Sequence, residues 1–393
     1  MSVYTEKTRM RFAIDAHAIG QHQTGNEVYI RNLLDRLASV DSEADFIAYF
    51  SSPAAASRLP NRILRRWVSS NPFVRLGWEL GRKINAERPA LLHVQYTAPL
   101  WSKVPIVVSV HDVSFLEHPE FFSFPRALQL QQTVKRTVER AARVLTVSEF
   151  SRAAIERHYP AARGKTCVTP NAVSAAFRPI PRDQARARVQ RLLGFSSPFL
   201  LNVGDLQPRK NQTGLIRAFE EFLRHNPGQP HHLVIVGQSK FDGELVKQVA
   251  ARSAVSSRIH FTGYVDDAFL HLLYNACELF VFPSFYEGFG IPILEAMACG
   301  CAVACSKTSA MPEVADGAAI FFDPRSTAEM TRSIQDLVLN PEMRSRYQRL
   351  GLARASVFSW DRTARQTLEV YYEVAGSDRR FAPDRHSIGA GKS

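Results

Sequence analysis

Two carboxylates separated by seven residues, Glu287 and Glu295, lie in the stretch YEGFGIPILEAMACG (286–300). The stretch follows a short apolar run that is typical of a buried strand, and it leads into a helix predicted to begin between about Gly290 and Pro292. Gly288 and Gly290 would let backbone N–H groups come close to a ligand at this helix N-terminus, where anions are favoured. A carboxylate there could accept hydrogen bonds from the hydroxyls of a polyol. The simpler alternative makes Glu287 a helix cap and Glu295 a surface charge.

Arg209 and Lys210 form a second candidate, within VGDLQPRKNQT (203–213). They follow a predicted strand and precede a helix expected to start near Asn211 or Gln212. The planar fork of arginine and the point charge of lysine would together neutralise a diphosphate. Ligands of open α/β sheets bind at the carboxyl ends of the strands, which favours a binding role over an ordinary solvated loop.

The N-terminal half contributes two further candidates. Gly20 and Gly25 lie in DAHAIGQHQTG (15–25), between a predicted strand and the first long helix, and could form a turn whose amides face a cleft. The dinucleotide fingerprint G-x-G-x-x-G is missing there. His111 directly follows a predicted strand and could hydrogen-bond a sugar or phosphate or exchange a proton, although a single histidine is more often simply packed.

Other catalytic patterns are missing from the sequence. Cys299, Cys301 and Cys305 are close together, but no C-x-x-C or histidine pair accompanies them, so we interpret them as small buried residues and expect no metal site. The sequence has no P-loop, no G-x-S-x-G motif and no D-x-D pair. This disfavours P-loop and α/β-hydrolase chemistry and leaves no carboxylate pair of that type for a metal.

The elements that must position these residues alternate between strands and helices. In the first half the predicted strands are Met10–Asp15, Asp45–Phe50, Leu91–Val94, Ile106–Val110, Val144–Val147 and Thr166–Thr169. In the second half they are Phe199–Val203, His232–Val236, Ile259–Phe261, Leu279–Phe282, Ala302–Ser306 and Ala319–Phe322. Intervening helical patterns, notably Asn26–Ala38, Arg126–Arg143 and Glu149–His158, indicate parallel sheets covered on both faces. The predicted fold class is α/β, with two Rossmann-like doubly wound domains facing each other across a cleft.

The length of 393 residues, with 45% hydrophobic and 22% charged residues, suits two globular domains. The aperiodic, proline-containing stretch 171–181 predicts the boundary between them. We expect residues 1–175 to form the N-terminal domain and residues 176–357 the C-terminal domain. Residues 358–375 would form a last helix that packs back on the N-terminal domain, and residues 376–393 a disordered tail.

The net charge of +12 is unevenly distributed. Residues 1–180 contain 24 Lys and Arg against 15 Asp and Glu, whereas residues 181–393 contain 25 against 22. An anionic lipid, nucleic acid or phosphorylated substrate would explain this excess, and so would a solvated basic surface. No basic stripe interleaved with aromatic residues is present, so no nucleic-acid partner is expected. The residues that could contact an anionic membrane are Arg62, Arg65, Arg66, Trp67, Arg75, Arg82 and Lys83.

Sequence features that determine the compartment point to the cytoplasm. The chain has no uninterrupted run of about 18 apolar residues and no signal-peptide pattern. Its five cysteines do not suggest a disulfide framework. We therefore expect a cytoplasmic protein, with peripheral association at the inner face of the membrane where the basic surface meets lipid.

Five motifs in sequence order resemble family 4 glycosyltransferases, which are retaining enzymes of the two-Rossmann-domain GT-B architecture. The motifs are V-x-x-H-D-V-S-F (108–115), V-S-E-F-S (147–151), G-D-x-x-P-R-K-N (204–211), F-T-G-Y-V-D-D (261–267) and the E-x7-E pair at 287 and 295. The resemblance extends from about residue 12 to residue 360. One departure is TGNEVY (24–29), where many relatives have a G-I-G-R-Y-like run, which puts the role of this loop in acceptor binding in doubt.

The resemblance implies a nucleotide sugar as co-substrate, with no cofactor and no metal. Arg209 and Lys210 would hold the donor diphosphate, Glu295 the ribose hydroxyls and Glu287 a hydroxyl of the transferred sugar. The catalytic set would consist of His111, Arg209, Lys210 and Glu287. The further donor-binding positions implied are Gly20, Gly25, Gly204, Tyr264, Val265, Gly288, Phe289, Gly290 and Ile291.

The expected donor is GDP-mannose, because HDVSFLEHPEFF (111–122) resembles enzymes that use it; a UDP-sugar is the alternative. The acceptor would be a saccharide or a lipid-linked saccharide in polysaccharide or glycolipid synthesis. A nucleotide-sugar hydrolase or epimerase of the same architecture would carry the same motifs. A dehydrogenase is disfavoured by the missing glycine fingerprint and by the Arg–Lys pair.

Overall fold

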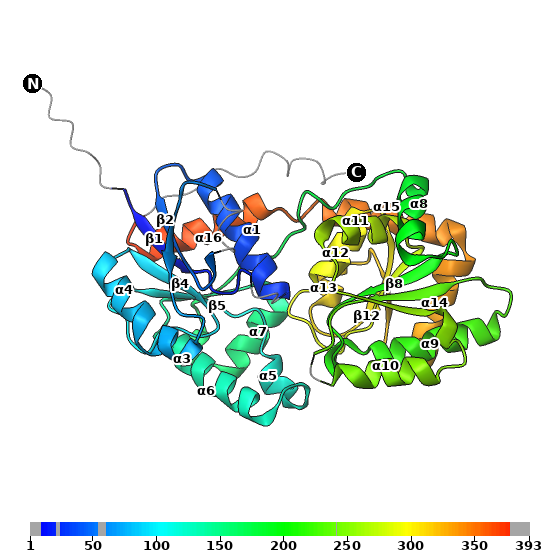
Figure 1. Cartoon of the computed structure of the whole chain (residues 1–393). Helices are drawn as coiled ribbons and strands as arrows, with labels where there is room; N and C mark the ends of the chain where they lie inside the picture. Colours follow the sequence, from blue (N-terminus) through cyan, green and yellow to red (C-terminus); the bar gives the residue numbers. More distant parts are fainter. Residues whose placement is uncertain (1–8, 21–23, 54–59, 241, 378–393) are drawn as a thin grey trace, which may run out of the picture.

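The chain folds into two α/β domains, each built on one parallel sheet with helices on both faces (Figure 1). The computed structural model describes residues 9–20, 24–53, 60–240 and 242–377. Its two sheets follow one another along the chain, as the alternating pattern of strands and helices predicts. The predicted fold class is confirmed.

The N-terminal sheet has the strand order β3-β2-β1-β4-β5-β6-β7. Its strands are β1 Arg11–Asp15, β2 Asp45–Phe50, β3 Ile63–Trp67, β4 Leu91–Gln95, β5 Ile106–Ser109, β6 Arg143–Thr146 and β7 Thr166–Val168. The helices around it are α1 Thr24–Val40, α3 Pro72–Val74, α4 Leu80–Glu87, α5 Ser114–Glu117, α6 Phe124–Arg140 and α7 Glu149–His158, with the short segments η1 Arg75–Glu79, η2 Pro119–Phe121 and η3 Pro160–Ala162. The direction of strand addition reverses between β1 and β4, so a crevice is expected outside their carboxyl ends.

The C-terminal sheet has the order β10-β9-β8-β11-β12-β13 and reverses between β8 and β11. Its strands are β8 Phe199–Val203, β9 His232–Val236, β10 Ile259–Gly263, β11 Leu279–Phe282, β12 Ala302–Ser306 and β13 Ile320–Phe322. The helices are α8 Arg182–Leu193, α9 Gln212–His225, α10 Gly243–Arg252, α11 Asp267–Ala276, α12 Ile291–Ala298, α13 Met311–Ala315, α14 Thr327–Leu339 and α15 Pro341–Ala355, with the single turns η4 Pro208–Lys210 and η5 Ser256–Arg258. Because β8 and β11 are neighbours, the loops that follow them meet.

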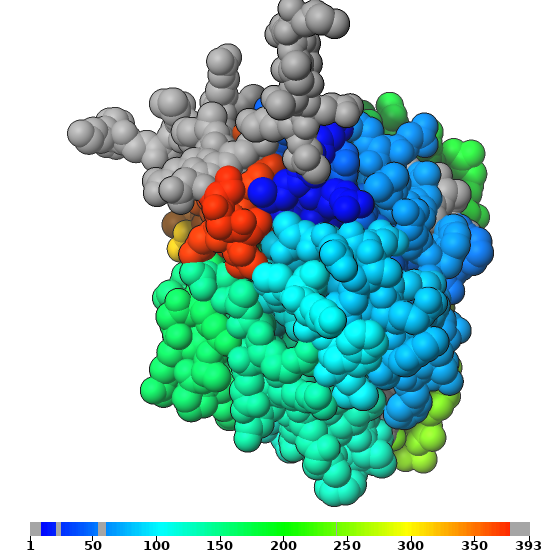
Figure 2. Space-filling model, turned by 90° about the vertical axis from the view of Figure 1, so that its left-hand side faces the viewer, coloured from blue at the N-terminus to red at the C-terminus, as the bar shows by residue number. Residues whose placement is uncertain are grey.

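The last helix, α16 (Trp360–Val374), leaves the C-terminal domain and packs on the N-terminal one. Its buried residues join the core that contains Phe12, and the ring centres of Phe12 and Tyr371 lie 5.2 Å apart. The hydroxyl of Tyr372 donates a hydrogen bond of 2.5 Å to Asp41 in the loop after α1. Figure 2 shows the red C-terminal segment seated against the blue N-terminal residues. Residues 378–393 of the predicted disordered tail lie outside the described residues.

All twelve predicted strands occur, with ends that differ by at most two residues. The sequence prediction missed β3, in which only Ile63 is buried and Arg65 and Arg66 interrupt the apolar pattern. As the edge strand of its sheet, β3 needs no second buried face and gives little hydrophobic signal. Among the described residues, no helix has the length and apolar character needed to cross a membrane.

Candidate active site

The loops after β8 and β11 bring two cations onto one carboxylate. Lys210 Nζ lies 2.6 Å from Glu287 Oε1, and Arg209 Nη1 lies 2.9 Å from Glu287 Oε2. The three side chains are between 11% and 16% exposed, so little water screens them. Burial alone would raise the pKa of Glu287, but the charges and hydrogen bonds of Arg209 and Lys210 outweigh it and lower the pKa to about 2. The carboxylate is therefore ionised at neutral pH, and the cluster has a net positive charge.

Backbone contacts fix this arrangement. The single turn η4 ends at Asn211, whose φ of +54° directs the chain into α9. The Asn211 amide donates to the carbonyl oxygens of Pro283 and Pro324, at 3.2 and 2.8 Å. The guanidinium of Arg209 donates to the Tyr286 carbonyl at 2.6 Å. The sequence prediction did not include Asn211, although its position before a helix is a recognisable signal.

Gly204 begins the loop after β8 and lies beneath the Lys210 side chain. A Cβ on Gly204 would lie 3.3 Å from Lys210 Cδ and Cε, so a side chain here would push against the stem of the lysine. The backbone N–H of Gly204 donates to Val236 of β9 at 2.8 Å. Gly204 thus belongs to the site through its position under the lysine.

Glu295 lies one helical turn inside α12, 8% exposed, and is separate from the ion cluster. Tyr274 on α11 donates a hydrogen bond of 2.9 Å to Glu295 Oε2. Burial raises the pKa of Glu295 to about 7, against the opposing effect of that hydrogen bond. The two carboxylates of the E-x7-E pair therefore have opposite environments, one held ionised by cations and one titrating near neutrality. Tyr274 was missed by sequence reasoning because it is distant in sequence from Glu295.

The glycine loop between the two carboxylates lies directly against the N-terminal domain. A Cβ on Gly288 would be 2.2 Å from the backbone oxygen of His111, so only glycine fits there. Gly290 has a φ of +99° and immediately precedes α12, which starts at Ile291 as the sequence predicted. Phe289 is 5% exposed, and its ring packs edge-on against Phe358.

His111 lies at the carboxyl end of β5, 9% exposed. Its Nε2 is 3.1 Å from Gln95 Oε1; because a carbonyl oxygen only accepts, the proton is on Nε2. Nδ1 is buried and has no hydrogen-bond partner among the described residues. Burial lowers the pKa of His111 to about 4, with Asp112 opposing the shift, so the ring is neutral at pH 7. Gln95 was not predicted, although it ends the neighbouring strand.

The glycine-containing loop of the N-terminal domain is only partly described. Gly20 has a φ of +83°, and its N–H donates to Glu27 on α1 at 3.1 Å. Gly25 lies in the first turn of α1, and residues 21–23 lie outside the described residues. Tyr264 and Val265 follow β10 and precede α11, with Tyr264 54% exposed. Their predicted contact with a nucleotide base stays a prediction.

Arg75 was expected at a membrane surface, and this prediction is wrong. Its side chain is 6% exposed, and its Nε lies 3.7 Å from Asp15 Oδ2. Asp15, at the end of β1, also lies 3.0 Å from His17 Nδ1. Burial would raise the pKa of Asp15, but His17 and Arg75 lower it overall. This buried group of charges gave no signal in the sequence because its members are up to 60 residues apart.

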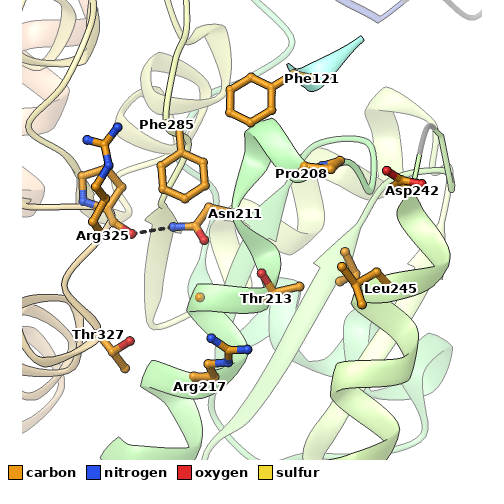
Figure 3. Close-up of a pocket in the computed structure, with 13 residues that line it drawn as sticks. Phe121, Pro208, Asn211, Thr213, Arg217, Asp242, Leu245, Phe285, Arg325 and Thr327 are labelled. Atoms are coloured by element: carbon orange, nitrogen blue, oxygen red, sulfur yellow. Dashed lines mark hydrogen bonds between the residues drawn. The ribbon is translucent and has the colours of Figure 1, made fainter. Parts of the chain in front are cut away.

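The three clustered cysteines Cys299, Cys301 and Cys305 are buried, as predicted. Over the described ranges no group of three or more His, Cys, Asp or Glu side chains could hold a metal ion. A pocket of about 310 Å³ lies beside the ion cluster, next to η4 and the start of α9 (Figure 3). Phe121 of the N-terminal domain and Phe285 stack above it, and Arg217 and Arg325 line it. It shares Pro208, Asn211 and Phe285 with the loops after β8 and β11. It includes none of the predicted catalytic residues His111, Arg209, Lys210 and Glu287.

Two doubly wound α/β domains, with Arg209 and Lys210 at the switch point of the second, have the GT-B architecture of glycosyltransferases. The chain belongs to glycosyltransferase family 4. Residues 24–177 match the family described as Glycosyltransferase Family 4, and residues 183–352 match Glycosyl transferases group 1. The resemblance seen in the sequence motifs is confirmed.

Two relatives support this assignment, and a solved structure shares the fold. The chain is 34% identical over 269 residues to O-antigen chain mannosyltransferase B of Escherichia coli, which covers 67% of this chain and 69% of that protein. It is 28% identical over 275 residues to the serotype-specific mannosyltransferase WbdA of Escherichia coli, covering 68% of this chain but only 33% of that protein. Among solved structures, sucrose-phosphate synthase from Thermosynechococcus elongatus is similar in fold, with a TM-score of 0.77, 19% identity, and coverage of 94% of this chain and 100% of that one.

Proposed function

We propose that this enzyme transfers a mannosyl residue from GDP-mannose to a saccharide or lipid-linked saccharide, with retention of the anomeric configuration. The convergence of Arg209 and Lys210 at the β8–β11 switch point is the observation that carries the proposal. The names of the two Escherichia coli relatives, both mannosyltransferases and one of them of the O-antigen chain, support the sugar and the type of product.

In the proposed reaction the bond between the anomeric carbon and the diphosphate oxygen breaks, and negative charge develops on the diphosphate. Arg209, Lys210 and the N-terminus of α12 stabilise that charge more strongly in the transition state than in the ground state. We propose that these groups supply the stabilisation without a divalent metal. The acceptor hydroxyl attacks from the same face of the sugar, and its proton passes to the departing diphosphate oxygen.

The remaining side chains would bind and orient the donor. When the diphosphate takes over the cations, Glu287 is released to accept a hydrogen bond from a sugar hydroxyl. Neutral His111 would accept another through Nδ1, and ionised Glu295 would hold the ribose hydroxyls. The base would lie against the backbone at Tyr264 and Val265, and the amides near Phe289 and Ile291 would face the sugar or phosphate.

The proposal includes peripheral contact with an anionic membrane, through exposed aromatic residues on the N-terminal domain. Phe73, Trp78 and Trp101 are 79%, 60% and 39% exposed. The guanidinium of Arg82 lies 5.1 Å from the centre of the Trp78 ring. Lys103, which is exposed, follows Trp101 by two residues. Aromatic rings beside cations suit the headgroup region of an anionic bilayer. A lipid-linked acceptor would be presented at such a surface.

The donor is tested by incubating the protein with a panel of nucleotide sugars and measuring release of GDP or UDP, with and without EDTA. We expect acceptor-dependent release of GDP from GDP-mannose that EDTA leaves unchanged. Release of UDP alone would overturn the donor, loss of activity in EDTA would overturn the metal-free mechanism, and free mannose formed without acceptor would identify a hydrolase.

The membrane contact is tested by flotation with vesicles of phosphatidylcholine and phosphatidylglycerol. We expect the protein to float at low salt and the Trp78→Ala/Arg82→Ala variant to float less. The matched control is Leu192→Ala/Arg191→Ala, which removes an exposed apolar and a basic side chain from the C-terminal domain. Wild-type protein that stays at the bottom of the gradient would remove the membrane from the proposal.

A further inference from the structure

The serines of the V-S-E-F-S motif lie between the two domains and bind the glycine loop of the candidate site. The hydroxyl of Ser148 donates a hydrogen bond of 2.7 Å to the Gly288 carbonyl. The hydroxyl of Ser151 lies 2.9 Å from the His111 carbonyl and 3.2 Å from the Gly288 carbonyl, so one donor is shared between acceptors from both domains. Both serines are fully buried.

The hydroxyl of Ser148 makes two hydrogen bonds, one as acceptor and one as donor. It caps α7, because its Oγ accepts from the Ser151 backbone N–H at 3.0 Å, and it also donates to Gly288. A serine that only capped a helix would need no acceptor from the opposite domain. The loop is held where Gly288 touches the His111 backbone, at a position where a side chain would not fit.

A carboxylate of the C-terminal domain completes the contact. Glu313 on α13 accepts from the backbone N–H groups of Glu149 and Phe150, at 2.8 and 2.9 Å, one to each oxygen. These N–H groups belong to the first turn of α7, where a helix has no internal acceptors and favours an anion. Glu313 and Glu149 are exposed, so water can replace this contact when the domains separate.

We propose that Ser148, Ser151 and Glu313 are positioning residues that hold the donor loop against His111 when the domains are closed. This inference rests on the proposed function, because it assigns the contact a role in the transfer step. Arg209, Lys210, Glu287 and Glu295 all belong to the C-terminal domain, so the donor binds there without the serines. The serines set where His111 lies relative to that bound donor, which affects turnover more than donor affinity.

The experiment compares Ser148→Ala/Ser151→Ala with wild type in three measurements: kcat, GDP affinity and stoichiometry by calorimetry, and domain separation by small-angle X-ray scattering. We expect kcat to fall roughly tenfold, as for the loss of two ordinary hydrogen bonds. The dissociation constant for GDP should change less than twofold, stoichiometry should stay near one, and the radius of gyration should increase. Glu313→Gln keeps one acceptor and should give a smaller fall in kcat.

The matched control is Ser333→Ala, because Ser333 is a buried serine that donates to a carbonyl within α14, away from the domain contact. It should leave all three measurements unchanged. The inference would be overturned if the double serine variant had the same kcat and the same radius of gyration as wild type. It would also be overturned if kcat fell equally in the Ser333→Ala control. Wild-type protein that binds no nucleotide would instead refute the proposed function, while the scattering comparison would still decide whether the serines hold the domains together.

Discussion

Lys210 and Glu287 form a buried ion pair, with 2.6 Å between Nζ and Oε1, although 77 residues separate them in sequence. Arg209 binds the other oxygen of the same carboxylate. The protein thus holds an internal anion on the cations that we assign to the donor diphosphate. Donor binding must therefore exchange Glu287 for the diphosphate as the anion that contacts these cations.

Lys210→Ala should lower kcat/KM at least about 100-fold, because a charge that stabilises the leaving group is lost in a site with little water. Steady-state release of GDP measures the effect. Lys247→Ala is the control, since that lysine is half exposed on α10 and pairs with Glu244 on the same helix. Activity close to wild type in Lys210→Ala would contradict the role assigned to the lysine.

Glu287→Gln should separate binding from turnover. Without the internal anion, the two cations are freer to bind the diphosphate, so the affinity for GDP should stay the same or increase. Turnover should still fall, because the neutral amide accepts the sugar hydroxyl less strongly. Calorimetry with GDP and a kcat measurement test both parts; weaker GDP binding together with normal kcat is the opposite of this expectation.

Affinity for the nucleotide sugar should increase with pH through neutrality because of Glu295. Its raised pKa of about 7 leaves the group mainly protonated at pH 6 and mainly ionised at pH 8. If the ionised form holds the ribose hydroxyls, binding should be up to roughly tenfold tighter at pH 8. Tyr274→Phe removes a hydrogen bond that lowers this pKa and should move the transition to higher pH, whereas Glu295→Gln should abolish it. A flat affinity profile in the wild type would count against this role.

Gln95 should determine the protonation of His111. The pKa of His111, lowered to about 4, keeps the ring neutral throughout the range from pH 6 to 8. Gln95→Glu places a carboxylate beside Nε2 and should raise that pKa, so that kcat falls at pH 6 and recovers towards pH 8. Gln95→Leu provides no charge and should lower kcat without this pH dependence. ¹⁵N NMR of the ring reports the site of the proton directly, and a proton on Nδ1 in the wild type would contradict the assignment.

Tyr372→Phe should destabilise the N-terminal domain by about 1–3 kcal/mol, because it removes a donor from the buried carboxylate of Asp41. Urea unfolding measures the change in the free energy of unfolding. Tyr347→Phe is the matched control, since the Tyr347 hydroxyl makes no hydrogen bond with any described residue. Equal stability of the two variants would show that α16 contributes little through this contact.

Much of the site was predictable because the relevant signals are local. A strand followed by a glycine-containing turn and a helix placed Arg209, Lys210 and Glu287 at the carboxyl ends of strands, where parallel sheets bind ligands. His111 was placed there because it directly follows a predicted strand. The start of α12 at Ile291 followed from Gly290 and the proline at 292. The edge strand β3 was missed because its arginines interrupt the apolar pattern on which strand prediction depends.

By itself, the sequence determined which elements form and which end of each strand carries polar side chains, since periodicity reports the buried face of a single element. Only the tertiary structure decided which elements become neighbours. The adjacency of β8 and β11 places Lys210 on Glu287, and the contact between domains places Ser151 between His111 and Gly288. The two glutamates of one motif acquired opposite pKa shifts for the same reason. Burial and charge partners depend on residues far away in the chain, and no local pattern records them.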